Sequence, residues 1–207
     1  LNDITLDKEF GAICGYTQAE LEFNFSEEIR SIAVEMNLSE HDLYEKIKQW
    51  YNGYGWLGER MYNPFSILNF IRKGEFNNFW FATGHPSFLI NQMTSVFAYN
   101  LENVEVDPIM FDGSSVDNID YRSLLFQTGY LTITAQNPDR GTVILNYPNK
   151  EVKDALLKYA LGGYANRSHA DSQISALDLR DALLEGNIER FKNTVNALFA
   201  SIPYDIF

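Results

Sequence analysis

The stretch Phe126-Gln-Thr-Gly-Tyr-Leu-Thr-Ile133, with the turn at residues 137–141 and the segment Thr142–Tyr147 that follow it, decides the predicted fold. Leu131 and Ile133 alternate with threonines, and the segment after the turn alternates in the same way. Because successive residues of a strand point to opposite faces of a sheet, this pattern predicts two strands with one buried face. The short turn between them contains Asn, Pro and Gly, which predicts an antiparallel hairpin.

The segments that flank this hairpin complete a recognisable order of elements. Residues 101–118 alternate weakly and predict one short strand and a loop. A helix capped by Asp117 or Asn118 follows, and Gly129 ends it just before the hairpin. Asn149 begins another helix directly after the hairpin. With a further helix upstream, the order helix, strand, helix, hairpin, helix is typical of a winged-helix module.

The N-terminal part of the chain predicts helices with strong start signals. Thr17 and Glu20 form a capping box, Ser39 can cap a second helix, and Asn63-Pro64 is an N-cap followed by proline at the first helical position. Glycines mark the predicted helix ends: Gly53 with Gly55, Gly74, Gly162 with Gly163, and Gly186 between the last two helices.

These patterns predict a mainly α fold with a small antiparallel β-hairpin. We divide the chain into a helical segment at residues 1–85, a winged-helix-like module at 86–165, and a connector with the final helices at 166–207. Residues 166–171 are polar and predict the connector itself.

Composition narrows the classes of function. The 207 residues are 45% hydrophobic, enough for a substantial core, and carry a net charge of -12. This negative charge disfavours a nucleic-acid surface, which needs clustered cations. The single Cys14 excludes an internal disulfide, and with three scattered histidines it argues against a zinc cluster and for a reducing, cytoplasmic setting.

Neither end of the sequence resembles a natural terminus, and no segment resembles a membrane-spanning helix. The chain begins at Leu1 and ends on the apolar run at residues 202–207, so we expect a fragment of a longer protein. No apolar run approaches the roughly 18 residues that a membrane-spanning helix needs, so no membrane partner is expected.

Aromatic residues beside Gly, Pro or Asn recur through the middle of the chain. Such residues fix backbone angles at turns and helix ends, and the rings pack these sites against a core. A ligand-stacking surface is the alternative interpretation of the aromatic segment 50–88, but rings at helical spacing beside helix caps favour a core. The structural motif residues are Tyr51, Gly53, Tyr54, Tyr62, Asn63, Pro64, Trp80, Thr83, Gly84, Gln127, Gly129, Tyr130, Pro148 and Asn149.

Sequence signatures of catalysis are missing from the chain. It contains neither the G-x-x-x-x-G-K-[ST] phosphate loop nor the G-x-S-x-G nucleophile elbow. His85 lies in a Gly-His-Pro turn with no Ser or Cys nucleophile pattern beside it. The acidic residues of the first two helices fall mostly off the apolar stripes, which favours a solvated face. We therefore predict no catalytic, cofactor-binding or metal-binding residue within the chain.

A winged-helix module raises the alternative of a DNA-binding regulator. Its nucleic-acid contacts would be Arg122 on the predicted recognition helix and Arg140 in the wing turn. Each arginine has an acidic neighbour, Asp120 and Asp139 respectively, whereas a phosphate-binding face needs several uncompensated cations. We therefore favour a wing that packs against another domain or contacts a partner over a wing that binds DNA.

The ordered blocks resemble the bacterial AAA-ATPase-like proteins that carry a C-terminal PD-(D/E)XK nuclease-like domain, over nearly the whole chain. The blocks that carry the resemblance are Leu1-Asn-Asp-Ile-Thr-Leu-Asp7 with Gly15-Tyr-Thr17, Tyr51-Asn-Gly-Tyr54, Tyr62-Asn-Pro-Phe-Ser66, Trp80-Phe-Ala-Thr-Gly84, Gln127-Thr-Gly-Tyr-Leu-Thr132, Tyr147-Pro-Asn149 with Glu151-Val152, and Leu183-Leu-Glu-Gly-Asn187 with residues 191–202. The resemblance implies that residues 1–85 are a helical lid segment, 86–165 a winged-helix-like part, and 166–207 the lead-in to the nuclease-like domain.

The resemblance also implies a function for the longer protein. ATP and Mg²⁺ would be bound outside these residues, and the fragment would couple nucleotide state to the nuclease-like domain without catalysis of its own. Its partners would be the neighbouring ATPase core and nuclease-like domain of the same chain, with a protein partner as a further expectation and no nucleic acid. A lid arginine contacts nucleotide phosphate in some AAA proteins, and Arg60 and Arg72 are the nearest candidates, with ordinary solvated arginines as the alternative. A protein-interaction scaffold without ATPase activity is a further alternative.

Overall fold

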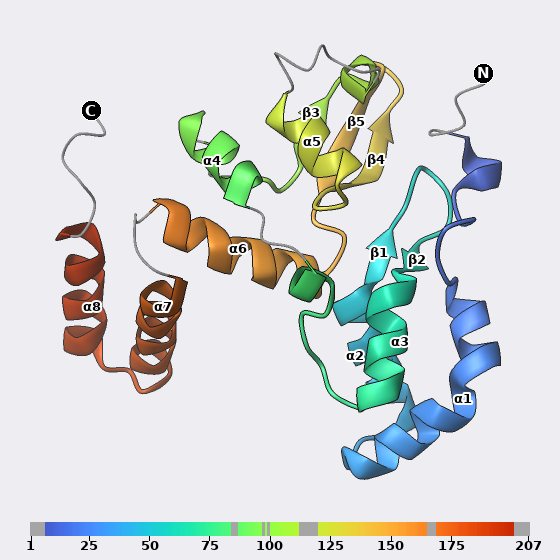
Figure 1. Cartoon of the computed structure of the whole chain (residues 1–207), viewed down its shortest axis with the longest axis horizontal. Helices are drawn as coiled ribbons and strands as arrows, with labels where there is room; N and C mark the ends of the chain where they lie inside the picture. Colours follow the sequence, from blue (N-terminus) through green and yellow to red (C-terminus); the bar gives the residue numbers. More distant parts are fainter. Residues whose placement is uncertain are drawn as a thin grey trace. The chain divides into compact units, whose positions relative to one another are not determined.

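A computed structural model describes residues 7–83, 87–96, 98, 100–111, 120–164 and 169–200 (Figure 1). The chain divides into two compact units. Unit 1 comprises Leu1–His85 with Tyr99–Asp154, and unit 2 comprises Pro86–Ala98 with Ala155–Phe207. The described residues are mainly helical with small antiparallel sheets, which confirms the predicted fold class. The boundaries predicted at residues 85 and 165 stay a prediction.

The helical part of unit 1 contains the short 3-10 helix η1 (Lys8–Phe10), α1 (Gln18–Glu35), α2 (Glu40–Tyr51) and α3 (Pro64–Lys73). The predicted capping box is present, since Thr17 Oγ1 accepts the Glu20 N–H and the Glu20 carboxylate accepts the Thr17 N–H at 2.9 Å. The caps by Ser39 and Asn63 and the left-handed Gly74 at the end of α3 are likewise confirmed.

An apolar cluster lies between these three helices. Tyr51 is fully buried in it and packs against Phe70 and Phe76, and α1 contributes Leu21, Ile29, Ile32 and Ala33. The buried members are Leu21, Ile29, Ile32, Ala33, Leu43, Ile47, Tyr51, Tyr62, Ile67, Phe70 and Phe79.

A two-stranded sheet separates α2 from α3, and the sequence patterns did not predict it. It pairs β1 (Asn52–Tyr54) with β2 (Met61–Tyr62). The glycines at 53 and 55 were interpreted only as a helix end. The helix does end at Tyr51, but the chain continues directly as a strand.

The second sheet of unit 1 holds the predicted hairpin and the predicted short strand. Its order is β3 (Val104–Val106), β5 (Thr142–Asn146), β4 (Thr132–Asn137), all antiparallel (Figure 1). Leu131, Ile133, Val143 and Leu145 are buried, as their alternation predicts.

Helix α5 (Tyr121–Gln127) precedes this sheet and follows the 3-10 helix η3 (Pro108–Phe111). Its N-cap is Asp120, whose side chain accepts the Arg122 N–H, whereas the predicted caps Asp117 and Asn118 lie outside the described residues. Its C-terminus is confirmed at Gly129, which has φ +81°. The Tyr130 N–H bonds Leu125 O at 2.8 Å, as in a Schellman motif.

Helix α6 (Lys150–Tyr164) contributes its first turn to unit 1 and the rest to unit 2. The prediction that Gly162 and Gly163 end it is wrong, because the helix continues through both glycines to Tyr164. Two glycines cost a helix only about 1 kcal/mol each, which neighbouring turns can offset.

Unit 2 also contains α4 (Ser87–Ser95), α7 (His169–Leu184) and α8 (Ile188–Ala200). Of the polar connector predicted at residues 166–171, residues 169–171 belong to α7, which begins at His169, and residues 166–168 lie outside the described residues. The predicted break between α7 and α8 is confirmed at Gly186, which has φ +66°. None of the described helices is long and apolar enough to cross a membrane.

Candidate functional site: the junction in unit 1

Half of the predicted structural motif residues converge at one place in unit 1, where the helical part meets the β3–β5–β4 sheet. We call this place the junction and define it as residues 53–55, Arg60, Trp80, residues 129–134 and residues 148–151. At its centre, the rings of Trp80 and Tyr54 flank Gly129. A Cβ atom on Gly129 would lie 3.5 Å from Trp80 Cζ2 and 3.6 Å from Tyr54 Cε1. The Trp80 ring centroid is 5.0 Å from that of Tyr130.

Gly53 brings β1 directly against the start of α6. Its φ of +133° lies in a region that side-chain-bearing residues rarely adopt. A Cβ at this position would lie 1.8 Å from the carbonyl oxygen of Pro148. Only glycine therefore permits this close approach of two backbones.

Arg60 joins the β1–β2 hairpin to β4 through backbone carbonyls. Its Nη1 donates to Gly53 O at 3.0 Å and to Ile133 O at 2.8 Å, and its Nη2 donates to Thr134 O at 3.0 Å. The guanidinium is half-buried, and this burial lowers its pKa. The fork of Arg60 thus satisfies carbonyls from two sheets. Contact of Arg60 with a nucleotide stays a prediction, and it would have to compete with these three bonds.

Thr132 provides the second link between the same elements. Its hydroxyl accepts the Gly55 N–H at 3.0 Å and donates to Gly55 O at 2.9 Å, and the residue is buried. The alternation pattern placed Thr132 on the exposed face of the hairpin. The structure buries it because Gly55 supplies both hydrogen-bond partners.

Glu151, in the first turn of α6, provides the third link. Its Oε1 accepts the Trp80 N–H at 2.9 Å, and the residue is 0% exposed. Burial raises the pKa of the carboxyl, and the Trp80 and Phe79 N–H groups and the Ser66 hydroxyl oppose the rise. The Asn149 side chain caps the same turn by accepting the Val152 N–H at 3.0 Å.

Other motif residues make contacts elsewhere in unit 1. The Tyr51 hydroxyl bonds both Asn77 N and Asn77 O at 3.0 Å, and burial raises its pKa. The Tyr62 hydroxyl donates to Gln18 Oε1, and burial raises its pKa to about 12. Gln127 reaches Phe111 O at 3.5 Å. The side chain of Thr83 and all of Gly84 lie outside the described residues.

The arginines considered for DNA contact are paired with carboxylates. Arg122 binds Asp120 through Nε at 2.9 Å and Nη2 at 2.6 Å. Arg140 Nη1 binds Glu105 Oε2 at 2.7 Å. Arg72, considered for nucleotide contact, is exposed at the end of α3 and makes no ion pair with the described residues. The structure thus brings none of these arginines together.

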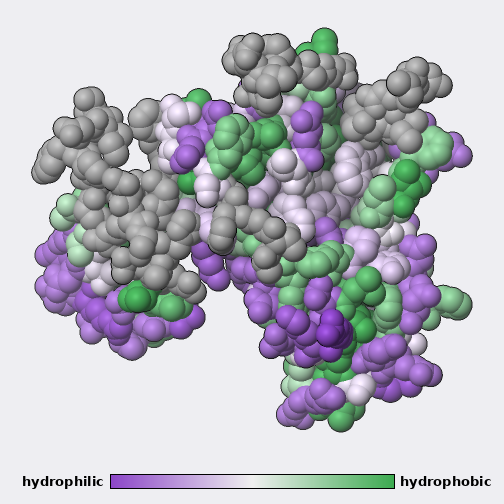
Figure 2. Space-filling model, in the orientation of Figure 1, coloured by the Kyte–Doolittle hydropathy of each residue, from purple (hydrophilic) through white to green (hydrophobic). Residues whose placement is uncertain are grey.

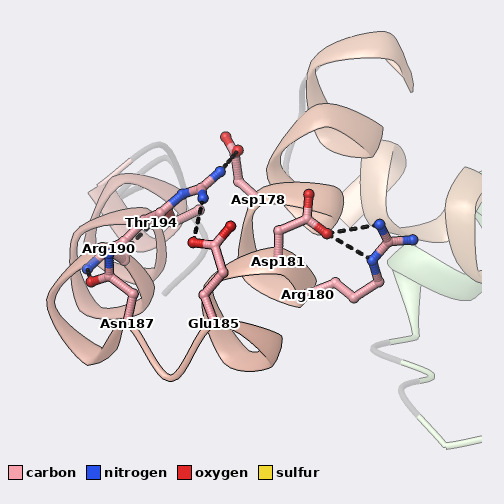
Figure 3. A network of polar contacts seen from close by, with 7 residues as sticks. All are labelled: Asp178, Arg180, Asp181, Glu185, Asn187, Arg190 and Thr194. Atoms are coloured by element: carbon pink, nitrogen blue, oxygen red, sulfur yellow. Dashed lines mark hydrogen bonds and ion pairs between the residues drawn. The ribbon is translucent and has the colours of Figure 1, made fainter.

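Unit 2 has a separate polar network on α7 and α8 (Figure 3). Arg190 reaches from α8 to Asp178 on α7 at 2.8 Å and to Glu185 in the turn at 3.1 Å. The network borders an open depression of about 660 Å³. Because both acidic partners compensate Arg190, the depression offers no free positive charge for an anion. Across the described parts of the chain, no group of His, Cys, Asp and Glu could hold a metal ion.

The same two helices expose much of their apolar surface. Among the residues whose burial is described, Ala182 is the buried residue of α7 and α8 has none. Apolar and polar residues also intermingle on the face shown in Figure 2. The exposed apolar side chains of the α7–α8 hairpin are Ile174, Leu177, Leu183, Leu184, Ile188 and Phe199.

Sequence reasoning found the residues that shape the junction but not those that tie it together. Arg60 was considered only as a phosphate ligand, Thr132 as an exposed strand residue, and Glu151 as part of a family block. A carboxylate in the first turn of a helix ordinarily lies in solvent, where it stabilises the positive end of the helix dipole. The position of Glu151 in the sequence therefore gives no indication that its side chain is buried.

Comparisons with known proteins give one relative. No protein-family model matches the chain, and no solved structure matches it. The chain is similar to the "Uncharacterized protein in vnfD 5'region" of Azotobacter chroococcum mcd 1, with 34% identity over 209 aligned positions. The alignment covers 99% of this chain and 38% of that protein. The chain therefore spans less than two fifths of the length of the curated relative it matches.

Proposed function

We propose that this chain is the lid and winged-helix segment of an AAA-type ATP-binding protein, a non-catalytic connector that passes nucleotide state to a C-terminal nuclease-like domain. The proposal starts from the resemblance of the ordered sequence blocks. One observation on the structure supports it: residues from the four blocks that begin at Tyr51, Trp80, Gln127 and Tyr147 meet at the junction, where they join the helical part of unit 1 to the β3–β5–β4 sheet.

A connector can pass on a displacement only if its parts move together. Arg60, Thr132 and Glu151 tie backbone to backbone across 71 to 77 residues of sequence, and the bonds of Thr132 are buried. Closely packed contacts of this kind hold a single geometry. A displacement of the helical part of unit 1 would therefore move the β3–β5–β4 sheet with it. Coupling further requires that nucleotide binds one arrangement of the longer protein more tightly than another.

The proposal assigns cofactors and partners to the longer protein. ATP and Mg²⁺ bind its nucleotide core, and this segment contacts that core and the nuclease-like domain of the same polypeptide in the cytoplasm. Arg72 is the better of the two lid candidates for a phosphate contact, because it is exposed and makes no ion pair with the described residues, whereas Arg60 already binds three carbonyls.

Calorimetry with ATP and Mg²⁺ on the full-length protein tests this function. We expect the full-length protein to bind ATP, Arg72→Ala to weaken that binding about tenfold, and the 207-residue chain alone to bind none. Arg30→Ala is the matched control, because Arg30 is an exposed helical arginine paired with Glu40. Tight ATP binding or turnover by the 207-residue chain alone would contradict the proposal.

Two other functions require different results. A DNA-binding regulator requires salt-dependent DNA affinity that Arg122→Ala or Arg140→Ala reduces, although both arginines are bound to carboxylates. A protein-interaction scaffold is favoured by the exposed apolar residues of α7 and α8. It requires a full-length protein that binds no ATP.

A further inference from the structure

The Glu151 carboxyl group is an unusual buried acid. The residue is 0% exposed, and its Oε1 accepts the Trp80 N–H at 2.9 Å. Its Oε2 is buried and has no hydrogen-bond partner within the part of the chain that the structure describes. A buried polar oxygen without a partner costs about 1–3 kcal/mol, and more when it is charged.

The groups that face this carboxyl are neutral hydrogen-bonding groups. They come from α2, β1, α3 and the segment that enters η2 (Trp80–Thr83): the phenols of Tyr51 and Tyr54, the Ser66 hydroxyl, and the N–H groups of Phe79 and Trp80. The Ser66 Oγ and Tyr54 hydroxyl atoms are themselves buried without a partner among the described residues. A protonated Glu151 could donate to one of these oxygens, whereas an ionised Glu151 could only accept from them; the Ser66 hydroxyl favours the ionised form, but burial is the larger influence on the pKa and favours the neutral one.

The lysines nearest in sequence do not compensate the carboxyl. The Lys150 ammonium bonds Asp154 and lies 5.2 Å from the centroid of the Trp50 ring. The Lys153 ammonium bonds Glu102 and lies 5.8 Å from the Tyr147 ring centroid. An ionised Glu151 would thus be a buried charge that only neutral hydrogen-bonding groups stabilise, with no counter-ion among the described residues.

We propose that Glu151 is a proton-operated latch, in which the neutral carboxyl holds η2 on the first turn of α6 and loss of the proton to solvent loosens that contact. The two latched segments lie shortly before His85 and Asp154, the positions at which the chain leaves unit 1. The latch therefore controls how firmly both outgoing segments are held in unit 1. This inference concerns the chain's own residues and does not depend on the proposed relation to ATPases.

The direction of the pH effect follows from linkage. Burial raises the pKa of Glu151 above its ordinary value of 4.5. The unfolded or opened form then ionises at lower pH than the closed form, so the stabilising effect is complete below 4.5 and is lost as pH rises through the higher value. In that window the ratio of open to closed latch rises by up to about tenfold per pH unit.

Hydrogen exchange at the Trp80 amide tests the latch. The rate is measured by mass spectrometry on the 207-residue chain from about pH 5 to about pH 8 and corrected for the intrinsic pH dependence of exchange. We expect protection of Trp80 to fall with rising pH in the natural chain and to stay constant in Glu151→Gln, whose neutral amide preserves the shape. Glu28→Gln, at an exposed position on α1, should behave like the natural chain.

Parallel protection in the natural chain and Glu151→Gln at every pH would overturn the latch. If Glu151→Gln fails to fold, the ¹³C resonance of the Glu151 carboxyl in the natural chain decides the question. A titration midpoint above the ordinary value of 4.5 supports the latch, and a midpoint at or below 4.5 refutes it.

Discussion

The junction in unit 1 and the α7–α8 hairpin in unit 2 are both held by polar contacts, but the contacts differ in kind. At the junction, Arg60, Thr132 and Glu151 bond backbone groups far away in sequence, and Thr132 and Glu151 are buried. Arg190 bonds carboxylates only 5 and 12 residues away, in solvent. Buried bonds leave unsatisfied groups when broken, whereas exposed ion pairs are replaced by water. The junction should therefore be much more sensitive to substitution than the hairpin.

Gly53→Ala should show the largest effect. The new Cβ would overlap the carbonyl oxygen of Pro148, and neither backbone can yield without separating β1 from α6. We expect a loss of about 3 kcal/mol or more in the free energy of unfolding. All three tryptophans lie in unit 1, so tryptophan fluorescence in a urea titration reports this unit. Gly141→Ala is the matched control, because nothing lies within 4 Å of its Cβ position, and it should cost about 1 kcal/mol.

Arg60→Ala should destabilise unit 1 by about 2 kcal/mol in the same titration, because Gly53 O, Ile133 O and Thr134 O lose a donor together. Arg60→Lys should recover only part of this loss, since an ammonium cannot reproduce the planar fork. A loss no larger than that of Arg30→Ala, whose ion pair is exposed, would place Arg60 in the same class as the surface pairs.

Thr132→Val preserves volume but removes a hydroxyl that both donates and accepts. We expect a loss of about 1–2 kcal/mol, because the Gly55 N–H and C=O lose their partner in a buried place. Thr134→Val, on the same strand, removes an exposed hydroxyl and should change the free energy of unfolding by less than about 0.5 kcal/mol. An equal loss in the free energy of unfolding for the two variants would show that burial of the hydroxyl does not determine its contribution.

Arg190→Ala should show the smallest effect, and one that salt removes. The Arg190 contacts with Asp178 and Glu185 lie at the surface, where added ions screen them. We expect faster hydrogen exchange in α8 at low salt and no difference from the natural chain at about 1 M salt. Arg180→Ala, which loses only a contact with the adjacent Asp181, should leave α8 unchanged at either salt concentration. If hydrogen exchange in α8 of Arg190→Ala stayed faster at high salt, the Arg190 contacts would be shielded from solvent ions, as the buried contacts of the junction are.

The same distinction explains where sequence reasoning succeeded. The caps at Thr17 and Asn63 and the end of α5 were predicted correctly because each involves groups within a few residues of one another. The β1–β2 sheet was missed because its strands are too short to show alternation. The end of α6 was misplaced because glycine tolerates a helix that its surroundings stabilise.

The sequence by itself determined the mainly helical class, most helix starts, the alternating hairpin and the glycines at tight turns. Only the tertiary structure decided that Gly53 meets Pro148, that Thr132 is buried against Gly55, that Arg60 binds carbonyls rather than solvent, and that Glu151 lies without a described counter-ion. The physical reason is the separation in sequence between the groups that interact. Caps and strand alternation arise from neighbouring residues, whereas each junction contact requires the chain to close a loop before either partner can show its role.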